Sequence, residues 1–149
     1  MAHVEASIVV ERPVQTVYNQ WTQFESFPEF MQGVEKVVQT DDTHLHWQAT
    51  IAGASREWDA EIVEQVPDQR IAWRSIGGEA NGGIVTFRPL AADRTEVHAR
   101  IEYEPEGLAE KAADAAGVVQ RRTTGDLERF KEFIEERGAE TGAWRGRVQ

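Results

Sequence analysis

Hydrophobic and polar residues alternate along most of the first hundred residues, which is the pattern of β-strands with one buried face. In the first predicted strand, residues 3–12, the residues that share the apolar face are Val4, Ala6, Ile8 and Val10. The same alternation predicts six further strands, at residues 34–39, 44–52, 56–66, 70–76, 84–90 and 95–104. Because short turns join them, we expect an antiparallel meander with one polar face and one covered face.

Other segments have the spacing of amphipathic helices. Residues 13–22 begin with Pro13, a residue favoured at the start of a helix, and a second short helix or turn is expected at 24–31. The longest helical pattern covers residues 108–137, and Gly138 is a natural stop after it. The apolar stripe of this long helix consists of Ala112, Ala116, Val119, Thr123, Leu127, Phe130 and Ile134.

Length and composition indicate one globular domain, residues 1–138. The chain has 149 residues, of which 40% are hydrophobic and 28% charged. Residues 139–149 have no apolar period, so we expect a flexible C-terminal tail there. No stretch approaches the ~18 apolar residues of a membrane span, and the first residues lack the features of a signal peptide. We therefore expect a cytoplasmic protein without stable membrane insertion.

Charge and cysteine content exclude several kinds of site. The chain has 16 Lys and Arg against 26 Asp and Glu, a net charge of −10, which argues against nucleic acid as a partner. It has no cysteine, which excludes disulfides, thiolate catalysis and cysteine-bound metals. His44 and His46 lie two residues apart on a polar strand face without a third ligand, so we interpret them as a surface pair. We expect no cofactor and no metal.

The tryptophans indicate a cavity. Trp47, Trp58 and Trp73 fall on the inward positions of consecutive strands, whereas the first half of the long helix offers small residues such as Ala112 and Ala116. A wide aromatic wall opposite small side chains predicts an apolar cavity. The alternative is that the rings pack directly on the alanines and fill the core.

Several segments resemble the polyketide cyclase/dehydrase and lipid-transport family of the START-like superfamily. They are residues 7–18, where a strand runs into a proline-started helix, residues 21–31 with their Phe-Pro-Glu-Phe kink, and the strands 56–62 and 70–75. The resemblance spans about residues 3–137. It implies the α+β helix-grip fold, in which a curved antiparallel seven-stranded sheet wraps around a long C-terminal helix. Two short helices lie between strands one and two, and the glycine-rich loop at 77–83 is expected near the cavity mouth.

The resemblance and the aromatic wall together predict a protein that binds a small hydrophobic or aromatic ligand, such as a lipid, a quinone or a polyketide-like molecule. The residues expected to line its cavity are Phe30, Trp47, Trp58, Trp73, Phe87, Tyr103, Ala116 and Thr123. The alternative is a polyketide cyclase/dehydratase, in which Tyr103 and Thr123 position or protonate a carbonyl of an aromatic polyketide precursor. A third hypothesis is a domain that binds a basic protein through its acidic surface.

Overall fold

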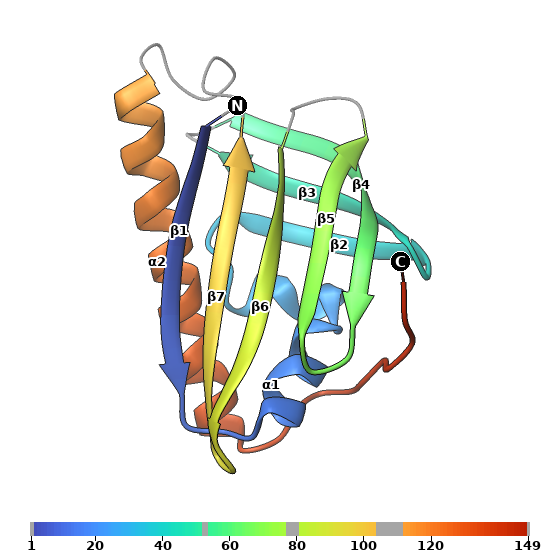
Figure 1. Cartoon of the computed structure of the whole chain (residues 1–149). Helices are drawn as coiled ribbons and strands as arrows, with labels where there is room; N and C mark the ends of the chain where they lie inside the picture. Colours follow the sequence, from blue (N-terminus) through green and yellow to red (C-terminus); the bar gives the residue numbers. More distant parts are fainter. Residues whose placement is uncertain (1, 52–53, 77–80, 104–111, 149) are drawn as a thin grey trace.

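The computed structural model describes residues 2–51, 54–76, 81–103 and 112–148, and it shows a curved sheet wrapped around a long helix (Figure 1). Within these residues, seven antiparallel strands form one sheet in the order β1-β7-β6-β5-β4-β3-β2. Their bounds are β1 Ala2–Val10, β2 Val34–Asp41, β3 His44–Ile51, β4 Ala54–Val66, β5 Arg70–Ile76, β6 Asn81–Ala91 and β7 Arg94–Tyr103. The helix-grip fold expected from the sequence is confirmed.

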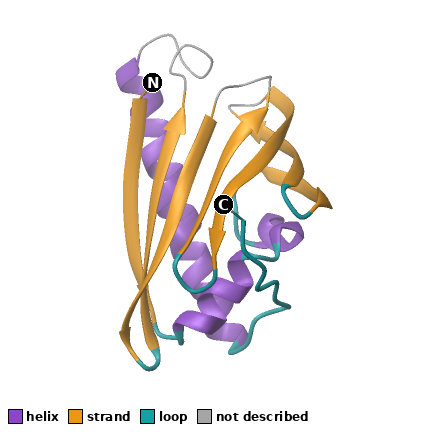
Figure 2. Cartoon of the chain, turned by 45° about the vertical axis from the view of Figure 1, so that its right-hand side comes forward, coloured by secondary structure: helices purple, strands orange, loops and turns teal. Residues whose placement is uncertain are grey.

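The helices all lie on one side of the sheet (Figure 2). They are α1 (Val14–Trp21), the short 3-10 helix η1 (Phe24–Glu29) and α2 (Ala112–Arg137). The first helical bond of α1 runs from the Val17 N–H to the Pro13 carbonyl oxygen, 3.1 Å away. Gly138 follows α2 with a φ of 79°, the left-handed conformation that ends helices. Of the long helix predicted at 108–137, residues 108–111 lie outside the described residues.

The glycine-rich segment differs from its prediction. β6 begins at Asn81, so Gly82 and Gly83 are strand residues rather than part of a loop, and residues 77–80 lie outside the described residues. Gly83 pairs with Trp73 on β5, and a Cβ on Gly83 would lie 2.9 Å from the Trp73 ring. The glycine therefore leaves room for the indole to cross the neighbouring strand.

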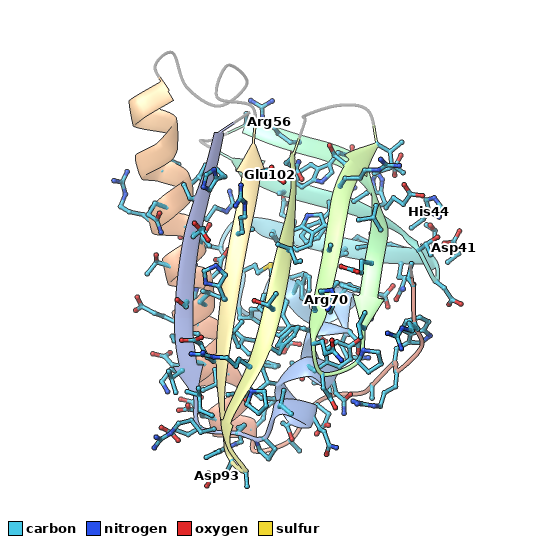
Figure 3. The ribbon with its side chains drawn as sticks, in the orientation of Figure 1. Asp41, His44, Arg56, Arg70, Asp93 and Glu102 are labelled. Atoms are coloured by element: carbon cyan, nitrogen blue, oxygen red, sulfur yellow. The ribbon has the colours of Figure 1, made fainter. Side chains whose placement is uncertain are left out.

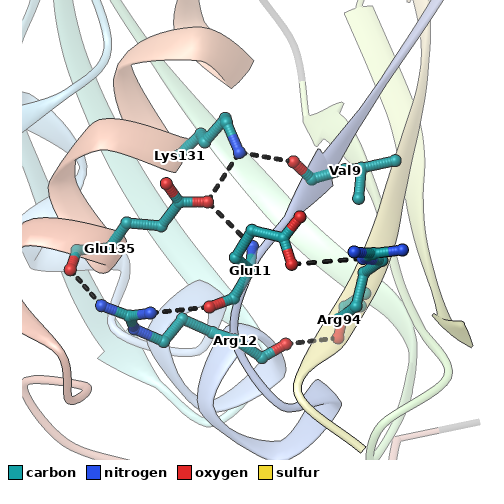
Figure 4. Close-up of polar contacts among 7 residues, drawn as sticks. Val9, Glu11, Arg12, Arg94, Lys131 and Glu135 are labelled. Carbon is teal, nitrogen blue, oxygen red and sulfur yellow. Dashed lines mark hydrogen bonds and ion pairs between the residues drawn. The ribbon is translucent and has the colours of Figure 1, made fainter. Parts of the chain in front are cut away.

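A polar network fastens the C-terminal part of α2 to the connection between β1 and α1 (Figure 4). The Glu135 carboxylate accepts hydrogen bonds from the Glu11 N–H at 2.8 Å and from Lys131 Nζ at 2.6 Å. Lys131 Nζ also donates to the Val9 carbonyl oxygen at 2.9 Å, and Arg12 donates to the Glu135 carbonyl oxygen. These bonds fix α2 against the edge strand β1.

The segment after α2 lies along the body of the protein. The Gln65 and Val148 backbones exchange two hydrogen bonds of 2.8 and 2.9 Å. Side chains of α1 and of Thr22, just after it, provide further partners: Asn19 bonds Glu140 and Arg145, Gln20 bonds Thr141, and Thr22 accepts from the Trp144 N–H. Arg145 also donates to Asp68 at 2.7 Å. These contacts are polar, so they leave no apolar period in the sequence. The flexibility of residues 139–149 stays a prediction.

The outer face of the sheet carries charged side chains, among them Asp41 and His44 at the turn between β2 and β3 (Figure 3). On β3, His46 lies between Asp59 and Glu57 of β4, with N···O distances of 2.8 and 3.0 Å. The hydrogen bond to Asp59 raises the pKa of His46 most, and the hydrogen bond to Glu57 raises it further. The outer face is therefore a set of exposed ion pairs, and the inner face is where the apolar side chains meet the helices.

Candidate functional site

The inner face is divided into a filled end and an open part. At the filled end, α1, η1 and the last turns of α2 bring together an interlocked group of aromatic rings. The ring centroids of Trp21 and Phe130 are 5.1 Å apart, and those of Phe30 and Phe130 are 5.2 Å apart. Phe130 and Ile134 are fully buried, as the predicted stripe of the long helix requires. This aromatic cluster closes one end of the molecule's interior.

A cavity of about 120 Å³ lies between the sheet and α2, next to the aromatic cluster. An apolar cavity of about 150 Å³ is large enough to bind benzene, so this one matches roughly a single ring. The lining residues are Trp21, Phe24, Phe27, Met31, Leu45, Trp47, Ile62, Ile71, Trp73, Val85, Ala99, Ile101, Thr123, Asp126 and Leu127. The lining is almost entirely apolar, which suits a hydrophobic ligand.

Three of the eight predicted site residues lie on the cavity wall: Trp47, Trp73 and Thr123. Trp58 is absent from the lining, because β3 and β4 pair it directly with Trp47 and the two rings stack 5.8 Å apart. The side chains of Tyr103 and Ala116 lie outside the described residues. The helix side of the described cavity is formed by Thr123, Asp126 and Leu127, further along α2 than the alanine-rich stretch that the sequence indicates.

The other two predicted residues pack elsewhere in the core. Phe30 belongs to the aromatic cluster and is only 2% exposed. Phe87 meets the Tyr18 ring edge-on, with the centroids 5.4 Å apart. Neither is among the lining residues. The part that all eight residues play in binding stays a prediction.

Sequence reasoning missed Asp126, a titratable residue on the cavity wall. Its spacing contains the signal, because Asp126 follows Thr123 by three residues and precedes Phe130 by four, which places all three on one helix face. It also missed Met31 and Phe24, although the apolar run around η1 is unusual for a connection between strands.

Charged groups surround Asp126 at one side of the cavity. Its Oδ1 accepts a hydrogen bond from the Gln32 N–H at 2.9 Å and another from Arg129 Nη2, and neither bond involves Oδ2. Burial raises the pKa of Asp126, and these two hydrogen bonds oppose the increase. Arg129 also donates through Nε to the Phe30 carbonyl oxygen at 2.9 Å. Asp126 and Arg129 thus form a part-buried pair anchored to the backbone around η1.

The other polar groups of the lining have limited capacity for chemistry. The Thr123 hydroxyl donates to the Val119 carbonyl oxygen at 2.8 Å. A hydroxyl has one proton to donate, so Thr123 can accept a hydrogen bond from a ligand but has no free proton for it. The indole Nε1–H groups of Trp21 and Trp47 are buried and find no acceptor among the described residues. These two are unused donors beside the cavity.

Comparison with known proteins shows which family this chain belongs to. The family described as "Polyketide cyclase / dehydrase and lipid transport" matches residues 10–132. The chain belongs to this family. It is 55% identical over 149 residues to an uncharacterized 17.2 kDa protein of Streptomyces lincolnensis, covering 99% of both chains.

Solved structures show the same fold. The Zhui aromatase/cyclase from Streptomyces sp. R1128 is similar with a TM-score of 0.75 and 20% identity, over 96% of this chain and 99% of that one. A START superfamily protein from Mycobacterium smegmatis has a TM-score of 0.70 and 15% identity, over 91% and 95% of the two chains. This member of the polyketide cyclase/dehydrase and lipid transport family therefore has a hydrophobic ligand-binding fold. Within the residues described, none of its helices is both long and apolar enough to cross a bilayer.

Proposed function

We propose that this protein binds a small, largely apolar molecule in the cavity between the sheet and α2, with about one ring or a short chain enclosed. The observation that carries the proposal is an apolar cavity of about 120 Å³ beside a fully packed aromatic cluster. Burial of apolar ligand surface at about 25 cal/mol per Å² supplies the affinity. A lipid tail, a quinone ring and a polyketide-like ring all meet this requirement.

The unused indole donors favour a ligand that carries an acceptor oxygen. Trp21 and Trp47 line the cavity, and their Nε1–H groups lack acceptors among the described residues. Leaving a buried donor unpaired costs about 1–3 kcal/mol, which a ligand oxygen within reach recovers after small ring movements. A carbonyl or phenol group on the enclosed ring therefore fits better than a pure hydrocarbon.

Titration with two ring compounds of similar shape tests this function. Acetophenone carries an acceptor oxygen and ethylbenzene does not, and binding is measured by calorimetry and by quenching of tryptophan fluorescence. We expect both compounds to bind, with acetophenone the tighter ligand. If neither binds and native mass spectrometry of the purified protein finds no retained small molecule, the proposed function is wrong.

A cyclase/dehydratase acting on an aromatic polyketide precursor is the second candidate. The observation that favours it is Asp126, whose raised pKa and position on the cavity wall are the properties of a general acid. Thr123 is poorly suited to protonate a carbonyl, since its proton is held by Val119. The test is product formation from a poly-β-ketone analogue by wild type and Asp126→Asn. Turnover that is lost in Asp126→Asn while binding persists supports catalysis, and the absence of turnover in the wild type rejects it.

A further inference from the structure

Arg122 lies at the edge of the cavity, where α2 passes the start of β2. It precedes Asp126 by one helical turn and Thr123 by one residue, and both of these line the cavity. Its guanidinium covers Gly33, because a Cβ built on Gly33 would be 3.0 Å from Arg122 Nη2. Met31, two residues before Gly33, also lines the cavity. The guanidinium therefore lies between α2 and the segment from Met31 to Gly33, and we call this edge of the cavity its rim.

No other described residue forms a hydrogen bond or an ion pair with the Arg122 guanidinium, although the side chain is only partly exposed. A guanidinium has five N–H donors, and burying it without a partner is unfavourable. Burial lowers the pKa of Arg122, and the nearby positive charge of Arg129 lowers it further, against the opposing effect of Asp126. The structure thus holds a cation at the rim without the contacts that normally stabilise one.

The neighbouring charges do not neutralise it. Asp126 is the carboxylate that acts on Arg122, but its Oδ1 is already bonded to Arg129 and to the Gln32 N–H. The three charged groups together carry two positive charges and one negative charge. This positive surplus stands in a chain whose net charge is −10, so it is a local feature and not the general tendency of the sequence.

We propose that Arg122 binds the carboxylate of an amphiphilic ligand whose apolar ring or chain occupies the cavity. The ligand class is a carboxylic acid with a short apolar body, and its anion cancels the surplus charge at the rim. An arginine can hold a carboxylate through two parallel N–H···O bonds, which also fixes the orientation of the ligand. This proposal rests on the proposed function, because the cavity must accept the apolar part.

The test compares phenylpropanoate with phenylpropanamide, which have the same shape but differ in charge. Calorimetric titration of the wild type is expected to show the carboxylate binding at least about tenfold more tightly than the amide. In Arg122→Gln the preference is expected to fall to about onefold through weaker carboxylate binding, with the amide affinity unchanged. Arg122→Lys keeps the charge but not the paired donors, and an intermediate preference is expected.

Arg121→Gln is the matched control, since it removes the same charge from the exposed side of the same helical turn. It is expected to keep the wild-type preference. A structural role for Arg122 predicts a lower melting temperature for ligand-free Arg122→Gln, whereas our proposal predicts an unchanged or higher one.

Equal binding of the two compounds by the wild type, or a preference that survives in Arg122→Gln, overturns the role of Arg122 and leaves the cavity function intact. Binding of neither compound overturns the role of Arg122, and the titration with acetophenone and ethylbenzene then decides the cavity function separately. The wild-type comparison decides the matter even if the variant does not fold.

Discussion

The filled end and the open part of the interior are both built from aromatic residues, yet one is a packed core and the other a cavity. At the filled end the rings come from three elements, α1, η1 and α2, and they meet at angles: Trp21 contacts Phe27, Phe30 and Phe130 within 6 Å between centroids. In the open part Trp47 and Trp73 of the sheet line the cavity together with Thr123 and Asp126 of α2, and Trp21, Phe24 and Phe27 of the filled end border the same cavity. The number of aromatic residues therefore does not distinguish the packed core from the cavity. What distinguishes them is the size of the side chains on the opposite wall.

The difference has an energetic side. A packed region loses dispersion contacts when a side chain is shortened and becomes strained when one is lengthened. A cavity has already given up such contacts, so it tolerates added volume and responds through ligand binding instead. A substitution that adds volume is therefore expected to lower the stability of the packed region, whereas in the cavity it is expected to reduce ligand binding.

The largest effect is expected from Phe130→Ala in the aromatic cluster. Phe130 is fully buried and contacts both Trp21 and Phe30, so its removal is expected to cost roughly 3–5 kcal/mol in the free energy of unfolding. Urea denaturation measures this cost. A loss below ~1 kcal/mol would mean that this end is not the packed core of the protein.

Removing residues 139–149 tests whether the filled end is stable without its outer cover. The deletion exposes Gln20, which is fully buried, and breaks its bonds with Thr141 together with those of Asn19. We expect a loss of about 2 kcal/mol, which lowers the melting temperature by roughly 4–8 °C in a domain of this size. An unchanged melting temperature would support the flexible tail that the sequence predicts.

A matched pair of alanines on the inner face gives the sharpest comparison. Ala60 is fully buried in the core without lining the cavity, whereas Ala99 lines it. Ala60→Leu is expected to cost about 1–3 kcal/mol through overpacking, and Ala99→Leu less than ~1 kcal/mol. Ala99→Leu is also expected to abolish acetophenone binding. Equal stability losses in calorimetric melting of the two variants would show that the cavity is not open space.

The smallest effect is expected from His46→Gln on the outer face, which touches neither region. The raised pKa of His46 means that its ion pairs stabilise the fold below its unfolded-state pKa of 6.5, and that this contribution is lost as pH rises through the folded value. The lowered pKa of Glu57 sets the acid limit, below its ordinary value of 4.5. The difference in melting temperature between wild type and variant should be largest between the lowered pKa of Glu57 and the unfolded-state pKa of His46, and it should disappear as the pH rises above the raised pKa of His46. It should be small throughout, because the pairs are exposed. A difference that does not change with pH would contradict this.

The sequence predicts the faces of the elements better than the site between them. Burial on one side of a strand makes every second residue apolar, and burial on one side of a helix gives Leu127, Phe130 and Ile134 their spacing of three and four. Both patterns are visible in the sequence. The stacking of Trp58 on Trp47 depends on the register between β3 and β4, which neither strand encodes alone. The position of the cavity depends in turn on how far along the sheet α2 lies.

The pairing of β1 with β7 has a consequence for how the protein is made. β1 leaves the ribosome well before its partner β7 and before the helix α2 that contacts it. Strand pairing over such a sequence separation requires the closure of a long loop and slows folding. The unpaired β1 must therefore stay soluble until β7 is made, and an outward charge such as the exposed Glu5 protects a free strand edge. A ribosome that stalls before β7 releases a chain whose first strand has nothing to pair with, and such a fragment should aggregate rather than fold.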